Sequence, residues 1–186
     1  MNHSSLKKSF KNQTLYDGFK TDPMNFFYIF WLYFFEYCVI ISFFDRITQL
    51  RDAESSDYWP EKNMFTISQF IYQAGVLVSR SSLYCFKLKI TGIITIILFA
   101  HFLAFFILCL WYQNVSIWIV FSLSLSVGIF GGWGYLFAFY RLMDNNLIND
   151  KNKEILINLL SITSIWGVLL SNWFTLIVSN TILKVE

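Results

Sequence analysis

The chain has 186 residues, of which 56% are hydrophobic, 20% aromatic and only 14% charged. Charged residues make up about a quarter of a typical soluble domain, so this composition excludes a soluble globular protein. The formal net charge of +2 says little about partners, and nothing in the sequence supports nucleic-acid binding. We therefore expect an all-α polytopic membrane protein whose surroundings are a lipid bilayer.

Five segments are expected to cross the membrane. An apolar helix needs about 20 residues to span the hydrocarbon core, and four runs reach that length, while a fifth is more polar. Residues 1–23 lack the apolar core of a signal peptide and are predicted to form a flexible cytosolic leader, and residues 183–186 a lumenal tail. The expected spans are about 24–44, 64–79, 90–112, 117–140 and 155–182.

The positions of the basic residues predict the orientation. With five spans, the leader and the second and fourth loops lie on one side and hold most of the 14 lysines and arginines. The positive-inside rule places that side in the cytosol. The N-terminus is therefore expected in the cytosol and the C-terminus in the lumen.

Glu36 lies near the centre of the first expected span, where an ionised carboxylate costs several kcal/mol. We expect it to be protonated, paired or facing water, with Tyr33 one turn earlier on the same helix face. Two interpretations remain open. Glu36 is either an acid that couples protons or contacts substrate in a transport path, or a neutral structural acid bonded to a neighbouring helix.

The second segment carries polar side chains at helical spacing, among them Gln69, Gln73 and Arg80. Because unsatisfied polar groups in hydrocarbon cost several kcal/mol, this stripe should line a protein interior or a wet cavity. Arg80, at its cytosolic end, would either extend to the lipid headgroups or close the cavity and hold an anionic group. The other members of the stripe are Ser68, Tyr72, Val76 and Ser79.

The third span contains His101, which could relay protons, although a hydrogen bond to another helix is the simpler interpretation. In the fourth span Ser124, Gly128 and Gly132 recur every four residues, a spacing that lets helix backbones approach closely. A phosphate-binding loop is disfavoured because no strand precedes these glycines and no lysine follows them.

The last span again carries a polar stripe, which includes Asn158, Ser164 and Asn172 within roughly 140° of a 3.6-residue helix. Together with Glu36 and the second segment it could line one polar cavity. Alternatively, these groups form interhelical hydrogen bonds worth about 0.6 kcal/mol each. The candidates for a transport path are Glu36, Gln69, Gln73, Arg80, Asn158 and Asn172.

No catalytic residues, metal site or cofactor are expected. Cys38, Cys85 and Cys109 show no paired spacing. The chain also lacks paired aspartates and the Gly-x-Ser-x-Gly and His-Glu-x-x-His motifs, so it has no nucleophile set for hydrolysis.

Three strings carry a family resemblance. They are Tyr33-Phe34 with Glu36-Tyr37, Tyr72-Gln73-Ala74-Gly75-Val76 followed by Ser79-Arg80-Ser81-Ser82-Leu83, and Gly131-Gly132 followed by Tyr135 and Phe139. In order and spacing they resemble the battenin family of lysosomal and vacuolar membrane proteins. The match runs over residues 25–172 and corresponds to the C-terminal half of that family.

The resemblance implies a fold similar to the C-terminal bundle of a major facilitator transporter. It also implies a lysosomal or vacuolar location and a part in lumenal pH homeostasis and small-solute transport. The substrate classes associated with the family are basic amino acids and lipid-derived phosphodiesters. The chain departs from the family pattern at three places. Ile40-Ile41-Ser42 stands where the family has an Asn-Gln-Gly run, Phe137 where it has an asparagine, and Ser164 where it has an acid, so the substrate is not carried over.

An alternating-access carrier needs two bundles, and this chain supplies one, with five expected spans where six are usual. The second bundle could be a missing N-terminal half, a partner subunit or a second copy in a parallel homodimer. The alternative function is a non-transporting scaffold that recruits trafficking or ion-handling partners through its cytosolic leader and loops.

Overall fold

The computed structural model describes residues 20, 22–52, 59–82, 89–111, 116–145 and 150–181, of which nearly all are helical and none lies in a strand. This confirms the expected all-α fold. The elements are α3 (Pro23–Tyr37), the π-helix η1 (Cys38–Phe43), α4 (Phe44–Asp52), α5 (Trp59–Lys62), α6 (Met64–Ser81), α7 (Thr91–Leu110), α8 (Ile117–Met143) and α9 (Asp150–Thr181).

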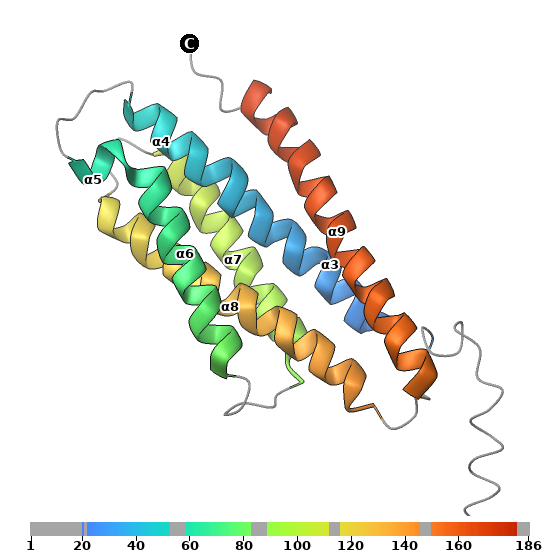
Figure 1. The fold of residues 1–186 in the computed structure, drawn as a ribbon. Helices are drawn as coiled ribbons and strands as arrows, with labels where there is room; N and C mark the ends of the chain where they lie inside the picture. Colours follow the sequence, from blue (N-terminus) through green and yellow to red (C-terminus); the bar gives the residue numbers. More distant parts are fainter. Residues whose placement is uncertain are drawn as a thin grey trace, which may run out of the picture.

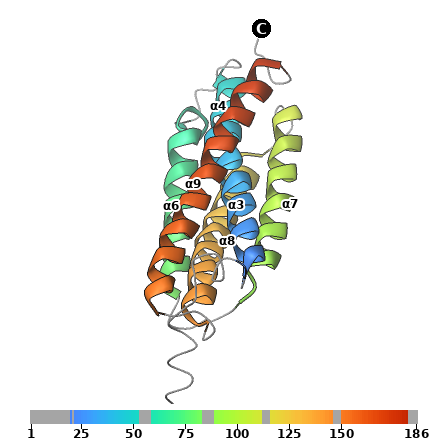
Figure 2. The same ribbon diagram turned by 90° about the vertical axis from the view of Figure 1, so that its right-hand side faces the viewer.

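The long helices form one elongated bundle (Figure 1). α3, η1 and α4 follow one another as a single rod, and α7 and α9 run in the same direction as this rod, whereas α6 and α8 run the opposite way. α6 packs along α8, and α9 packs along α3. α3 therefore lies at the centre, with α7, α8 and α9 around it (Figure 2).

Four helical stretches of the described residues are long and apolar enough to cross a membrane, which confirms a multi-pass membrane protein. The more polar segment expected as a fifth span is α6, an 18-residue helix inside the same bundle. The four stretches are Pro23–Gln49, Thr91–Leu110, Ile117–Met143 and Asn152–Thr181.

The first helix is longer than the sequence predicts. A loop is expected from residue 45 to residue 63, yet α4 continues the helix to Asp52 and α5 forms a further helical turn. One side of α4 is buried, because Ile47 is only 1% exposed. The Thr48 hydroxyl donates to the Phe44 carbonyl of the same helix at 2.8 Å. Because charged residues stand between the buried ones, the apolar run in the sequence ends early and does not predict this helical extension.

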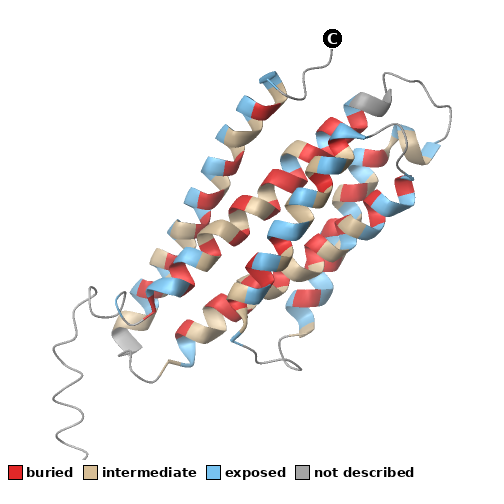
Figure 3. Ribbon diagram, turned by 180° about the vertical axis from the view of Figure 1, so that it is seen from behind, coloured by how far each residue is buried: buried red, intermediate tan, exposed pale blue. Residues whose placement is uncertain are grey.

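Aromatic rings join α3 to its neighbours in the core. Phe34 is 5.7 Å from Phe174 of α9 and 6.4 Å from Phe102 of α7, measured between ring centroids. Centroid separations of 4.5–7 Å are the favourable range for such pairs. The outward sides of the helices carry exposed apolar residues, such as Ile96 and Leu103 of α7, which lipid would cover (Figure 3).

Glycines bring the backbones of α6 and α8 together. A Cβ atom at Gly75 would lie 2.7 Å from the Leu125 carbonyl oxygen, and one at Gly128 would overlap the Tyr72 carbonyl oxygen. No side chain fits between the two helices at these points. The close contact fixes where the side chains of α6 stand relative to α8.

The other two members of the small-residue repeat lie on the same side of α8. A Cβ atom at Gly132 would overlap the Ser79 hydroxyl of α6. Ser124 is fully buried, and its hydroxyl donates to the Val120 carbonyl at 2.7 Å. The structure thus places Ser124, Gly128 and Gly132 in the buried part of α8, with both glycines at the α6 contact.

Candidate functional site

Glu36 lies in the last turn of α3 and is only 4% exposed. The Tyr72 hydroxyl of α6 donates a hydrogen bond to Glu36 Oε1 at 2.7 Å. On the third side, a Cβ atom at Gly131 of α8 would overlap the same oxygen. The carboxyl group is therefore held between three helices, and we call Glu36, Tyr72 and Gly131 the Glu36 site.

The hydrogen-bond partner differs from the one expected. The sequence predicts that Tyr33, one turn before Glu36, helps to satisfy the acid, whereas the bond comes from Tyr72 on another helix. The Tyr33 ring instead stacks on Tyr37 at 5.9 Å and meets Tyr135 of α8 edge-on at 6.3 Å. Spacing within one helix cannot show which residue of a different helix approaches.

Arg80 is exposed, and its guanidinium carbon lies 4.9 Å from the centre of the Tyr135 ring. Such a cation–π contact at an exposed site is worth about 0.5–1 kcal/mol. Tyr135 in turn meets Tyr33 of α3, the helix that carries Glu36, so two ring contacts lead from Arg80 to that helix.

Gln69 of α6 makes a second polar contact with the first helix. Its Nε2 donates to the Ile40 carbonyl at 3.0 Å. Ile40 belongs to η1, the π-helix that directly follows the Glu36 turn. α6 thus holds α3 and η1 by two hydrogen bonds from residues one helical turn apart, Gln69 and Tyr72.

The polar stripe of α6 does not form one buried face. Ser68, Tyr72, Val76 and Ser79 are buried against the bundle, whereas Gln73 and Arg80 are exposed. The stripe is wider than the side of α6 that α8 covers. Ser68, Tyr72, Val76 and Ser79 thus lie in a protein interior, as expected, whereas a wet cavity lined by Gln73 and Arg80 stays a prediction.

On α9, Asn158 is exposed and Asn172 is half-buried. The hydroxyls of the α9 stripe bond to their own helix, as Ser164 does to the Ser161 carbonyl and Thr175 to the Ser171 carbonyl, both at 2.7 Å. Thr175 also meets Ser42 of η1. A single cavity lined by Glu36 and both stripes stays a prediction.

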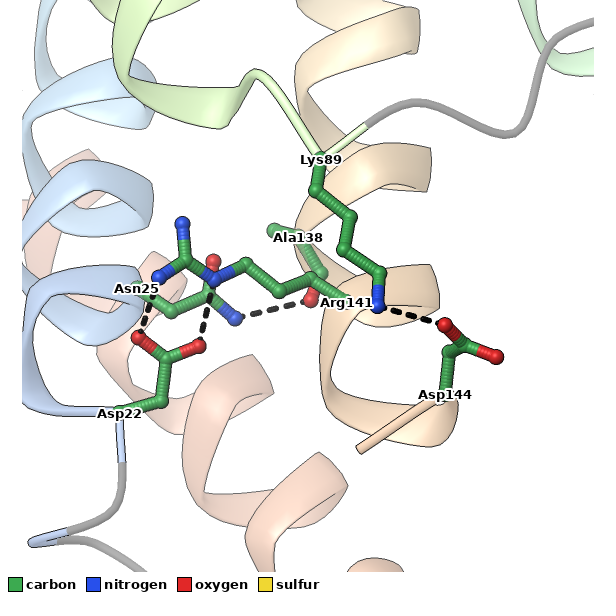
Figure 4. A network of polar contacts seen from close by, with 6 residues as sticks. All are labelled: Asp22, Asn25, Lys89, Ala138, Arg141 and Asp144. Carbon is green, nitrogen blue, oxygen red and sulfur yellow. Dashed lines mark hydrogen bonds and ion pairs between the residues drawn. The ribbon is translucent and has the colours of Figure 1, made fainter. Parts of the chain in front are cut away.

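A network of charged residues joins the start of α3 to the end of α8 (Figure 4). Arg141 donates from Nε and Nη2 to the two carboxylate oxygens of Asp22, at 2.6 and 2.9 Å. Asn25 Nδ2 donates to the Ala138 carbonyl at 2.8 Å. Nearby, Lys89 pairs with Asp144 at 2.6 Å.

The sequence interpretation missed this network. The only signals were the position of Asp22 immediately before Pro23 and of Arg141 in the last turn of α8. These contacts hold α8, and with it Gly131, in a fixed register against α3.

His101 makes the interhelical contact that the simpler interpretation predicts. Its Nε2 lies 2.6 Å from the Ser126 hydroxyl of α8, and its Nδ1 lies 2.8 Å from the Ile97 carbonyl of its own helix. Both ring nitrogens therefore have partners inside the bundle.

Apolar outward faces and a carboxyl group enclosed by three helices define a helical multi-pass membrane protein with an intramembrane acidic site. The chain belongs to the CLN3 protein family, whose model matches residues 3–185. This confirms the family resemblance drawn from the three sequence strings.

Relatives bear the name battenin. The chain is 32% identical over 155 residues to battenin of Dictyostelium discoideum, which covers 83% of this chain and 36% of the relative. It is 29% identical over 150 residues to battenin of Canis lupus familiaris, with coverage of 78% and 32%. Protein BTN1 of Debaryomyces hansenii is 25% identical over 122 residues, with coverage of 60% and 28%.

The matched part of the chain thus spans about a third of the length of these curated relatives. No solved structure matches the chain.

Proposed function

We propose that the chain forms one bundle of a battenin-like carrier, not an enzyme, in the lysosomal or vacuolar membrane. In this role it contributes to lumenal pH homeostasis and moves small solutes. The observation that carries the proposal is Glu36, a carboxyl group that is 4% exposed and held by Tyr72. Ionisable groups at membrane depth are costly and mark proton or substrate pathways.

The proposed proton step takes place on Glu36. Gln69 and Tyr72 are the polar groups through which α6 holds Ile40 and Glu36. A shift of α6 along the first helix breaks both hydrogen bonds together and leaves the carboxyl group open to water and to proton exchange. The π-helix η1 beside it supports this mechanism, because π-bulges are frequent at functional sites.

Arg80 is the proposed contact for solute. Its guanidinium can hold a carboxylate or phosphate through charge-assisted hydrogen bonds, and it is exposed beside the Tyr135 ring. Basic amino acids carry a carboxylate, and lipid-derived phosphodiesters carry a phosphate. An anionic group on Arg80 would act on α6, the helix that also carries Tyr72, and so link solute binding to Glu36.

A second bundle completes the proposed carrier, either as the N-terminal half of a longer protein, as a partner subunit or as a parallel second copy. Two exposed amides support this, since hydrocarbon would not solvate Gln73 of α6 and Asn158 of α9. Crosslinking in native membranes should join the chain to a second bundle. Recovery of monomers alone would count against it.

In the proposed orientation the N-terminus lies in the cytosol and the C-terminus in the lumen. Arg80, Lys89 and Arg141 then lie near the cytosolic end of the bundle, as the positive-inside rule requires.

The proposal is tested by solute uptake into vesicles from cells that express the chain, measured across a range of lumenal pH. Glu36→Gln keeps an oxygen for the Tyr72 hydrogen bond but cannot exchange a proton, so uptake should lose its dependence on pH. Ser122→Ala, an exposed change on α8, is the control. Unchanged pH dependence in Glu36→Gln would remove the proposed role of Glu36.

A second experiment separates a carrier from a scaffold. Residues 1–20 are deleted while the helices are kept. A carrier should retain uptake, whereas loss of the cellular phenotype with unchanged location of the protein would favour the scaffold.

A further inference from the structure

A polar pocket of about 560 Å³ lies between η1, α4 and α9. It is at the end of the bundle that holds α4 and the C-terminal end of α9, opposite the end where α6 carries Arg80 (Figure 1). Its polar lining includes Ser42, Asp45, Arg46 and Ser179. We call this space the Arg46 pocket.

Arg46 is 8% exposed, and Gln49 orients it from one side. Arg46 Nη1 donates to Gln49 Oε1 at 3.2 Å, and Gln49 Nε2 donates in turn to Asp45 Oδ2 at 2.8 Å. The two other donor atoms, Nε and Nη2, are buried and have no hydrogen-bond partner in the part of the chain that the structure describes. A buried guanidinium with unused donors is costly, which points to a ligand.

The chain itself shows what this edge of a guanidinium binds. Nε and Nη2 are the same two atoms with which Arg141 holds the carboxylate of Asp22 (Figure 4). Their N–H groups form a fork that matches two oxygens of a carboxylate or phosphate. The same edge of Arg46 can therefore hold an oxyanion once it turns toward the pocket that Arg46 lines.

The other lining residues narrow the choice of ligand. Asp45 places a carboxylate in the same pocket, so a ligand with both a negative and a positive group is complementary. Ile41 and Leu176, which are 40% and 56% exposed, give the pocket apolar walls. The pocket also lies where two membrane-crossing stretches end, at Gln49 and Thr181, which is the depth of the lipid headgroups.

We propose that the Arg46 pocket binds the zwitterionic headgroup of a phospholipid such as phosphatidylethanolamine. The phosphate enters the pocket and binds Nε and Nη2 of Arg46, which turn toward it from their buried position. The ammonium faces Asp45, and the first acyl carbons lie against Ile41 and Leu176. This site is separate from the Glu36 site and does not depend on the proposed transport.

The test measures how much phosphatidylethanolamine stays on the full chain in native mass spectrometry from mixed micelles. Arg46→Gln should reduce the bound fraction about tenfold, because one charge-assisted bidentate contact is lost. Arg46→Lys should bind several-fold less than wild type, because it keeps the charge and loses the fork. Lys62→Gln, which removes an exposed charge from the same end of the bundle, should bind as wild type does.

A second variant distinguishes loss of the lipid contact from misfolding of Arg46→Gln. Ser179→Trp fills the pocket from the side of α9 and leaves Arg46 intact, and it should cause a similar loss. Asp45→Asn should shift the preference from phosphatidylethanolamine toward phosphatidylglycerol, which has no ammonium group.

Equal lipid retention by wild type, Arg46→Gln and Ser179→Trp would overturn the proposal. So would displacement of the lipid by free phosphoethanolamine or by alanine at the same concentration, since the ligand would then be a soluble zwitterion.

Discussion

Gly128→Ala should loosen the contact that sets the Glu36 site. A Cβ atom at Gly128 would overlap the Tyr72 carbonyl oxygen and lie 3.0 Å from its carbonyl carbon and 3.2 Å from its Cα. These are backbone atoms, which cannot rotate away, so α6 and α8 must separate. Overpacking of this kind costs up to about 3 kcal/mol, and replacing a helical glycine by alanine returns about 1 kcal/mol. We expect a net loss of about 2 kcal/mol of unfolding free energy.

Gly132→Ala is the matched comparison. Its Cβ would overlap the Ser79 hydroxyl, a side-chain group that can rotate, and would lie 3.2 Å from the Val76 carbonyl oxygen. This backbone contact is milder than the one at Gly128, so we expect a loss below about 1 kcal/mol. Ser122→Ala, at an exposed position of α8, should stay within about 0.5 kcal/mol of wild type. Denaturant unfolding of the purified chain in micelles gives all three values. A Gly128→Ala chain as stable as wild type, or a larger loss in Gly132→Ala, would contradict a backbone contact at Gly128.

The remaining predictions concern polar contacts between helices. Arg141→Gln leaves the Asp22 carboxylate, whose side chain is 7% exposed, without its charged partner, and should lower the unfolding free energy by about 3 kcal/mol. Thermal unfolding of the purified chain measures this, and adding Asp22→Asn should recover part of the loss; no recovery would argue against the pair. Gln69→Leu removes the donor to the Ile40 carbonyl and should cost about 1 kcal/mol. Hydrogen exchange should then accelerate in η1 and not in α7, and equal protection of η1 in both proteins would contradict the role given to Gln69.

Much of the fold follows from patterns within single segments. Long apolar runs located the helices of the four membrane-crossing stretches, and the four-residue repeat of Gly128 and Gly132 marked the side of α8 that α6 meets. Such patterns depend only on spacing along one helix, which is why they can be seen without a structure.

Partners between helices could not be predicted in this way. The acid at Glu36 was visible as an isolated charge in an apolar run, but its bond to Tyr72 depends on how α6 leans on α3. Arg46 looked like an ordinary loop residue because the helix was expected to end before it, and only packing of α4 buries it. The pair of Asp22 and Arg141 joins residues more than a hundred positions apart.

The polar stripe of α6 also shows what spacing along one helix cannot predict. Helical spacing correctly grouped its polar residues on one side, but it could not tell which of them α8 covers. Tyr72 is buried, while Gln73, the next residue, is exposed. The exposed part of the stripe is the part that a second bundle would cover in the proposed carrier.

The central claim, that Glu36 couples proton movement to solute movement, is tested most directly with a pH-sensitive dye inside proteoliposomes. The chain is reconstituted with its second bundle, and the proton flux that follows addition of solute is recorded. The wild-type chain should give a solute-dependent proton flux. Tyr72→Phe should give an altered flux, because it keeps the carboxyl group of Glu36 but loses the hydrogen bond to it. Glu36→Gln should give no solute-dependent flux. The same solute-driven flux in Glu36→Gln as in wild type would contradict the claim.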